Sequence, residues 1–109
     1  PEPLTVFPVM VATGTDDAQW SALVAWTIHT LTSAERPETQ WYAGGVRAMP
    51  IEAPELGLDK DWQRRVVTAI GNYGEIFERN LGSRSPLKLE RGFNANQING
   101  GLLLSPFIE

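Results

Sequence analysis

The feature that most constrains the fold of this chain is a helical pattern that glycines interrupt at residues 71–82, with the sequence GNYGEIFERNLG. A glycine inside a helix costs about 1 kcal/mol relative to alanine, so core packing alone does not favour Gly71 and Gly74 three residues apart. We therefore expect a helix that bends or breaks at these glycines and then restarts, with backbones in close approach. Gly82 suits a left-handed cap after Leu81.

Two long helices are expected around this run. Asp16, with Gln19 three residues later, resembles a capping box and predicts a helix over about residues 17–35 that Pro37 closes. Its apolar stripe consists of Trp20, Leu23, Val24, Thr27, Ile28 and Leu31. The second helix is expected to begin after Asp59 as N-cap. One amphipathic face then continues through the glycine run, formed by Trp62, Val66, Ala69, Ile70, Tyr73, Phe77 and Leu81.

The remaining segments are less regular. Residues 1–14 are β-rich but divided by Pro8, which predicts one or two short strands or a crossing linker. Residues 36–58 are rich in Pro and Gly, and we expect a surface segment anchored by apolar side chains. A short helix near residues 93–98 should end at a glycine pair, and residues 102–108 should pack back onto the core. The expected fold is one domain over 1–109, mainly α, or α+β if the amino-terminal strand element pairs.

Composition excludes several functions. The 109 residues carry a net charge of −4 and no concentration of Lys or Arg, so nucleic acid is a poor partner. No apolar run reaches the roughly 18–20 residues of a membrane span. The absence of cysteine excludes disulfides and thiolate metal sites. The chain has no initiating Met and no signal peptide, which is compatible with a mature, trimmed or excised piece.

The search for reactive groups favours structural roles. His29 is the only histidine, so no multi-histidine metal site exists, and we interpret it as a rim residue. The acidic pairs Asp16-Asp17 and Asp59/Asp61 stand at helix starts, where capping is a better explanation than acid–base catalysis. No catalytic, cofactor-binding or metal-ligating residue is predicted, no cofactor is expected, and the chain is interpreted as non-enzymatic.

Structural roles are also favoured for two further groups of side chains. Glu75 and Glu78 with Arg79 are helical neighbours, which an i,i+4 surface pairing explains. The chain has four tryptophans, Trp20, Trp26, Trp41 and Trp62. They offer two alternatives, an aromatic pocket for a cation or a sugar and packing in the core, and core packing is favoured.

Ordered blocks of sequence then suggest a family. They cover roughly residues 16–106 and consist of DDAQW with VAWT (16–27), LGLD with Trp62, NYGEIFERNLG (72–82), and PLKLERGFNA (86–95) with Gly100-Gly101. This series resembles the carboxyl-terminal segment of periplasmic substrate-binding proteins of polar and general L-amino-acid ABC transporters. The resemblance implies a fold like the carboxyl-terminal part of a type II periplasmic binding protein, whose two α/β lobes hold the ligand between them.

The same resemblance implies a function and its limit. In that family an arginine holds the ligand carboxylate and an acidic group holds its amine, in stretches that have no match here, so the ligand-binding residues stay unknown. The chain is therefore expected to be a periplasmic scaffold portion in amino-acid transport. An L-amino acid would bind only in a full-length parent, which would also meet an ABC permease.

Alternatives stay open. The Pro- and Gly-rich middle segment favours a free-standing, repurposed helical interaction module, and the tryptophans allow a small-molecule binder or a small enzyme. Because the apolar stripes need burial, we also expect a homo-oligomer, with the amino-terminal segment a candidate for exchange between copies.

Overall fold

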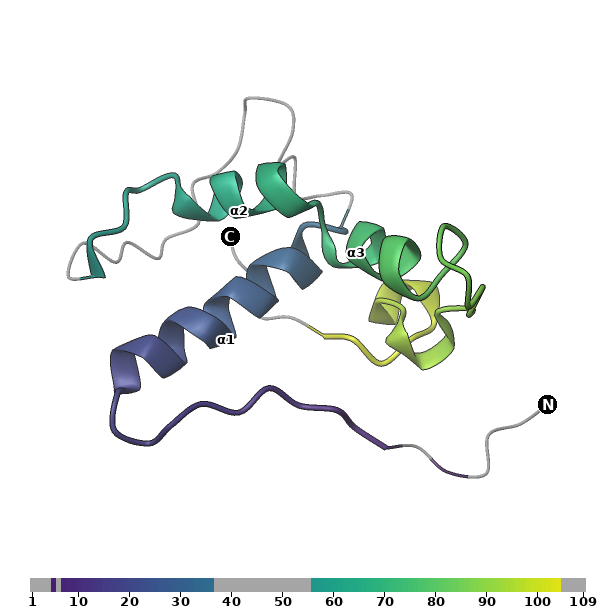
Figure 1. The fold of residues 1–109 in the computed structure, drawn as a ribbon, viewed down its shortest axis with the longest axis horizontal. Helices are drawn as coiled ribbons and strands as arrows, with labels where there is room; N and C mark the ends of the chain where they lie inside the picture. The colour runs from purple at the N-terminus through teal and green to yellow at the C-terminus, as the bar shows by residue number, and fades with distance from the viewer. Residues whose placement is uncertain (1–4, 6, 37–55, 105–109) are drawn as a thin grey trace.

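The computed structural model describes residues 5, 7–36 and 56–104, and these form a small set of packed helices (Figure 1). The helices are α1 (Ala18–Ser33), α2 (Trp62–Ile70) and α3 (Tyr73–Asn80), followed by the 3-10 turns η2 (Gly92–Asn94) and η3 (Gln97–Asn99). Within these residues the β structure is one isolated bridge between Asn96 and Leu103. The mainly α prediction therefore agrees with the described part.

Of the two alternatives for residues 1–14, the short strands are wrong for residues 5 and 7–14, which run as an arm without strand pairing, and a linker is the alternative that agrees with these residues. A β-rich stretch needs a neighbouring strand to satisfy its backbone groups, and the described residues place none beside it. The predictions for Trp41 and for most of the irregular segment concern residues 37–55, which lie outside the described residues.

The N-cap of helix α1 lies one residue later than predicted. Asp17, not Asp16, is the N-cap, because its extended backbone lets its carboxylate accept a hydrogen bond from the Trp20 N–H at 2.9 Å. The helix ends at Ser33, and the N–H of its C-cap, Ala34, donates to the Thr30 carbonyl at 2.9 Å. It is thus shorter at both ends than the expected span of 17–35.

Helix α2 also begins later than expected. The Asp59 carboxylate accepts a hydrogen bond from the Asp61 N–H at 2.9 Å, which closes a turn two residues long. Because Asp59 is occupied in that turn, the N-cap position falls to Asp61, directly before Trp62. The prediction of Asp59 as N-cap is therefore wrong, although the acidic residue does precede the helix.

The predicted interruption at the glycine run is confirmed. Gly71 ends α2 with φ 83° and ψ 177°, a conformation that side chains disfavour strongly. Asn72 then caps α3 in a reciprocal capping box: its side chain accepts from the Glu75 N–H at 2.9 Å, and the Glu75 carboxylate accepts from the Asn72 N–H at 2.9 Å. The expected second long helix is consequently two short ones.

Gly82 does not adopt the predicted left-handed conformation, since its φ is not positive. Its role is close approach: a Cβ at Gly82 would lie 2.8 Å from the Glu78 Cα, and its N–H donates to the Phe77 carbonyl at 2.9 Å. The chain folds back tightly on the last turn of α3, which excludes any larger side chain.

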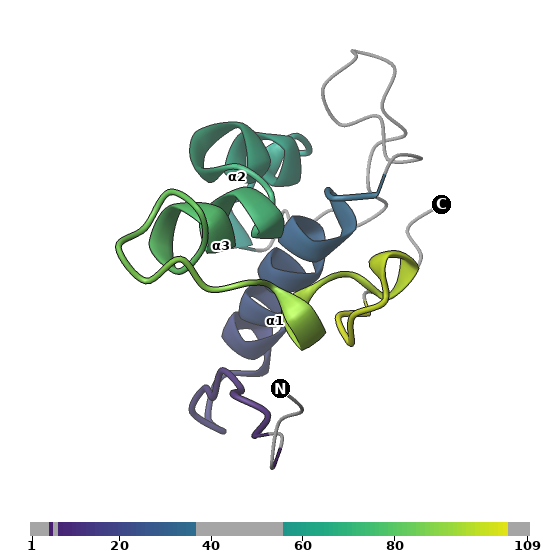
Figure 2. The same cartoon turned by 90° about the vertical axis from the view of Figure 1, so that its right-hand side faces the viewer.

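The core lies where the carboxyl-terminal end of α1 meets α2 and α3, which both pack beside α1 (Figures 1 and 2). Its buried apolar side chains are Ala34, Trp62, Val67 and Phe77. The buried Gln63 amide donates to the Thr30 hydroxyl at 3.1 Å, which joins α2 to α1.

The single apolar face predicted from Trp62 to Leu81 is interrupted, because Ile70 is 42% exposed and Leu81 is 40% exposed. The backbone break at Gly71 disrupts the helical periodicity on which that face depended.

The carboxyl-terminal residues form two 3-10 turns in place of the one expected helix. The expected glycine stop is confirmed, because Gly100 takes the left-handed conformation with φ 84°. A Cβ at Gly101 would collide with the backbone of Ala95. The expectation that the apolar tail packs onto the core is wrong for Leu102 and Leu104, which are exposed. The segment 105–109 lies outside the described residues.

Candidate functional site: an apolar groove between α1 and α2

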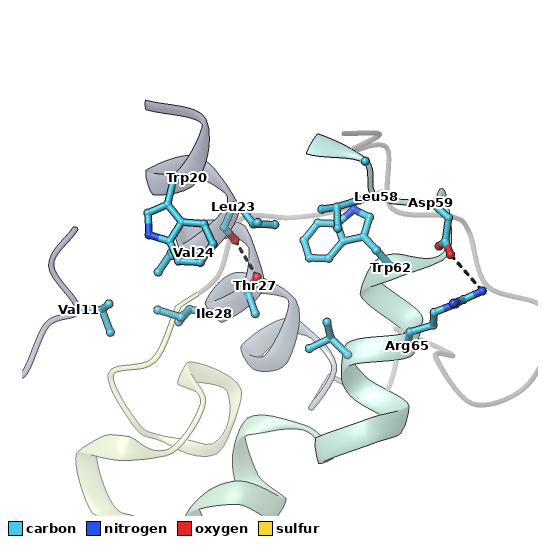
Figure 3. Close-up of a pocket in the computed structure, with 12 residues that line it drawn as sticks. Val11, Trp20, Leu23, Val24, Thr27, Ile28, Leu58, Asp59, Trp62 and Arg65 are labelled. Carbon is cyan, nitrogen blue, oxygen red and sulfur yellow. Dashed lines mark hydrogen bonds and ion pairs between the residues drawn. The ribbon is translucent and has the colours of Figure 1, made fainter. Parts of the chain in front are cut away.

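A groove of about 670 Å³ separates the amino-terminal half of α1 from the start of α2 (Figure 3). Helix α1 forms one side, the segment 57–66 forms the other, and the amino-terminal arm contributes Val11. The lining residues are Val11, Trp20, Leu23, Val24, Thr27, Ile28, Gly57, Leu58, Asp59, Trp62, Arg65 and Val66.

The groove follows from the apolar stripe of α1. Residues spaced three and four apart share one face of a helix, so the side chains of Trp20, Leu23 and Thr27 lie on one side of α1. The stripe exists as predicted, but it lines an open groove because α2 covers only the far end of α1, near Thr30. Trp20 is therefore 54% exposed.

The tryptophans divide accordingly. Core packing is confirmed for Trp62, which is buried, and is wrong for Trp20. Trp26 is half-buried and makes an edge contact with the ring of His29, with centroids 5.3 Å apart. Trp41 lies outside the described residues. Among the described tryptophans, Trp20 and Trp62 lie on opposite sides of the groove. They do not form an aromatic cage.

The polar groups of the groove are paired with one another. Arg65 forms an ion pair with Asp59 at 3.0 Å along one edge, and the Thr27 hydroxyl donates to the Leu23 carbonyl at 2.7 Å (Figure 3). The other lining side chains are mostly aliphatic or aromatic, so a zwitterionic amino acid away from this edge would lose hydration without a charged partner. The groove is suited to apolar side chains.

The extended arm beside the groove is also apolar. Val9 is 97% exposed and Met10 is 82% exposed, and Phe7 and Val11 are similarly open. Val11 lines the groove, and Phe7, Val9 and Met10 precede it in the arm as exposed apolar side chains. We call the groove together with the arm residues 7–11 the α1–α2 surface.

A second cluster ties three distant segments together. Arg91 makes a two-pronged ion pair with Glu35, just beyond α1, with Nη2 and Oε2 3.0 Å apart. Its Nη2 also donates to the Asn94 carbonyl at 2.9 Å, and its guanidinium lies 5.7 Å from the centre of the Tyr73 ring and 5.9 Å from that of Phe77. The hydrogen bonds to Glu35 raise the pKa of Arg91, so it stays charged.

Gly74 makes room for this cluster. A Cβ at Gly74 would lie 2.3 Å from Oε1 of Glu35 and 2.8 Å from Nη1 of Arg91. Close approach at the glycine run was predicted, but Glu35 and Arg91 were not identified as partners. They are 56 residues apart, and a charged residue beyond a helix end carries no signal of so distant a partner.

The residues considered for chemistry have structural roles here. Asp17, Asp59 and Asp61 stand at helix starts. Within the described residues no cluster of His, Asp and Glu could hold a metal ion. No helix among them has the length and apolarity needed to cross a membrane.

The acidic side chains of α3 depart from one prediction. Glu75 was expected to pair with Arg79, but its carboxylate caps the helix start, and Arg79 donates to the Ile70 carbonyl at 3.0 Å. Glu78 accepts hydrogen bonds from the backbone and the hydroxyl of Ser83, which lower the pKa of its carboxyl. Both glutamates thus act on the backbone near them.

Comparison with known proteins shows which proteins this chain is similar to. No family model matches the chain. The general L-amino acid-binding periplasmic protein AapJ of Rhizobium johnstonii is 36% identical, over 97% of this chain and 36% of AapJ. The glutamate/glutamine/aspartate/asparagine-binding protein BztA of Rhodobacter capsulatus is 31% identical, over 97% of this chain and 36% of BztA. Nearly the whole chain is homologous to amino-acid-binding periplasmic proteins of ABC transporters.

A solved structure agrees with the sequence relatives. An ABC transporter periplasmic binding protein from Brucella ovis with glutathione bound superposes with a TM-score of 0.72 and 37% identity, over 87% of this chain and 34% of that one. The chain thus spans about a third of the length of the proteins it matches. The relatives are solute-binding proteins, which supports the interpretation of the chain as non-enzymatic.

Proposed function

We propose that this chain is the carboxyl-terminal scaffold portion of a periplasmic amino-acid-binding protein of an ABC transporter, with the architecture of a type II binding protein. In this role residues 1–109 act as one part of a larger two-lobed molecule. The chain contributes packing surface, and the ligand contacts come from elsewhere in the parent. The permease partner and the amino-acid ligand belong to that complete molecule.

Two observations together support the proposal: the homology to amino-acid-binding proteins, and a groove that is poorly suited to bind an amino acid. The relatives match almost all of this chain while the chain covers 36% of AapJ. The charged groups that line the groove, Asp59 and Arg65, already satisfy each other. Recognition of an α-amino acid requires a cation for the carboxylate and an acceptor for the amine, and the charged groups of this groove for either role, Arg65 and Asp59, are paired with each other at its edge.

Calorimetric titration with a panel of L-amino acids tests the proposal. We expect no binding by the chain alone. We expect binding by a full-length chimera in which residues 1–109 replace the matching segment of AapJ. Tight binding by the chain alone, or a folded chimera that binds nothing while AapJ binds under the same conditions, would contradict the scaffold role.

A second candidate function is a small-molecule binder that uses the groove. It is favoured by the groove volume of about 670 Å³ and by the tryptophans Trp20 and Trp62 on its two sides. An apolar ligand that entered the groove would change tryptophan emission, and Trp20→Phe would reduce that change. The exposed apolar surface likewise favours the free-standing interaction module, which would bind a helical partner without an amino acid.

For the isolated chain we propose a homo-oligomer. Val9, Met10 and Trp20 leave a large apolar area in contact with water, and association would bury part of it. Size-exclusion chromatography with light scattering measures the mass directly. A strictly monomeric species at micromolar concentration would contradict this proposal.

A further inference from the structure

We propose that the α1–α2 surface is the face on which the remaining polypeptide of a two-lobed amino-acid-binding protein packs. The inference rests on the proposed function and extends it by assigning the contact to one surface. The occupant is the part of the parent chain that residues 1–109 do not include, and it would present apolar side chains to Trp20, Leu23 and Val11.

The first argument is that burial of α1 is one-sided. Its carboxyl-terminal end contacts α2 and α3, and Thr30, which accepts a hydrogen bond from Gln63, is fully buried there. Its amino-terminal half lines the open groove, where Trp20 remains 54% exposed. Full burial of a large apolar side chain contributes about 1.5–3 kcal/mol, so a helix that leaves such a stripe open lacks a partner on that side.

The second argument is the chemistry of the surface. Its ionic groups, Asp59 and Arg65, are paired at the edge, and its floor is aliphatic and aromatic. An occupant therefore needs apolar side chains in the centre and ordinary polar groups at the rim. This matches the packing face of a protein and not a charged solute.

The third argument concerns length. The fold of this chain superposes on 34% of the Brucella ovis protein, so the same helices occur inside a chain about three times longer. AapJ and BztA each extend well beyond the matched 36%. Each of those polypeptides contains further residues beyond the matched part, which favours the remaining chain over a second copy as the occupant.

Cysteine labelling tests the assignment, because the chain contains no cysteine. Trp20→Cys and Val11→Cys each place a thiol on the α1–α2 surface, where both side chains are exposed. Ala22→Cys is the matched control: it is exposed on the same helix, and two residues along a helix turn by about 200° to the opposite side. Each variant is made in the isolated chain and in the full-length AapJ chimera, and labelling by a maleimide is read at that site by mass spectrometry.

We expect labelling at positions 20 and 11 to be about tenfold or more slower in the chimera than in the dilute isolated chain, with little change at position 22. Equal rates in the two proteins at positions 20 and 11, or equal protection of all three positions, would overturn the assignment. Protection that grows with concentration of the isolated chain, while the chimera stays reactive, would identify a second copy as the occupant and also overturn it.

Amino-acid binding by the same chimeras separates the two proposals. Protection at positions 20 and 11 in a chimera that binds no amino acid would leave the packing face standing and contradict the proposed function. Binding without protection would do the reverse. Because two different surface positions are probed, failure of one variant to fold does not remove the test.

Discussion

Replacing Gly71 by alanine is expected to destabilise the chain by about 2–4 kcal/mol, and the structure gives the reasons separately. Gly71 has φ 83° and ψ 177°, a region that is almost closed to other residues and costs roughly 1–3 kcal/mol for alanine. The new Cβ would also lie 2.2 Å from Oε2 of Glu75, which must then leave its position. That movement removes the hydrogen bond between Glu75 and the Asn72 N–H, worth about 1 kcal/mol as part of a helix cap.

Urea denaturation followed by helical circular dichroism measures this loss in the full chain. For a domain of this size each kcal/mol lowers Tm by about 4 °C, so a fall of roughly 8–16 °C should accompany it. Gly100→Ala is the matched control, because Gly100 has φ 84° but an added Cβ there meets nothing within 4 Å. That variant should show a smaller loss of about 1–2 kcal/mol, from the left-handed conformation alone.

The double variant Gly71→Ala/Glu75→Ala tests the coupling. Once the Glu75 carboxylate is absent, the alanine at position 71 no longer displaces it. The stability lost in the double variant should therefore be smaller than the sum of the losses in the two single variants. Strict additivity of the two substitutions, or a Gly71→Ala variant no less stable than Gly100→Ala, would refute the steric part of the reasoning.

Three further predictions concern other parts of the structure. Glu35→Ala should lower the free energy of unfolding by about 2–3 kcal/mol, which is less than for a fully buried ion pair because the Arg91 side chain is 20% exposed. Glu35→Asp should not restore the paired geometry, and thermal unfolding measures the stability of both variants. Val67→Ala should cost about 2 kcal/mol because a side chain 2% exposed leaves a cavity, and an unchanged urea midpoint would contradict its place in the core. The lowered pKa of Glu78 means that its contribution is present above the ordinary value of 4.5 and is lost as pH falls through the folded value. Glu78→Gln should therefore lose less stability on acidification than the parent chain, and equal losses in the two would exclude a contribution from Glu78.

Much of the local structure was predictable because its causes lie within a few residues. The interruption after Ile70 follows from the two glycines and Asn72, and Gly100 ends the last turn because it can adopt a left-handed conformation. The apolar stripe of α1 follows from helical spacing. Cap positions were less certain, because Asp17 and Asp61 compete with the neighbouring acidic residues Asp16 and Asp59, and backbone conformation selects between them.

What the sequence alone determined was therefore the positions of the main helical regions, the interruption at the glycine run and the family resemblance. Only the tertiary structure decided that Glu35 meets Arg91 across 56 residues, that Gly74 makes space for them, and that Trp20 faces an open groove while Trp62 is buried. Periodicity identifies the apolar face of a helix but not which neighbour covers it, because that depends on how distant segments pack in space.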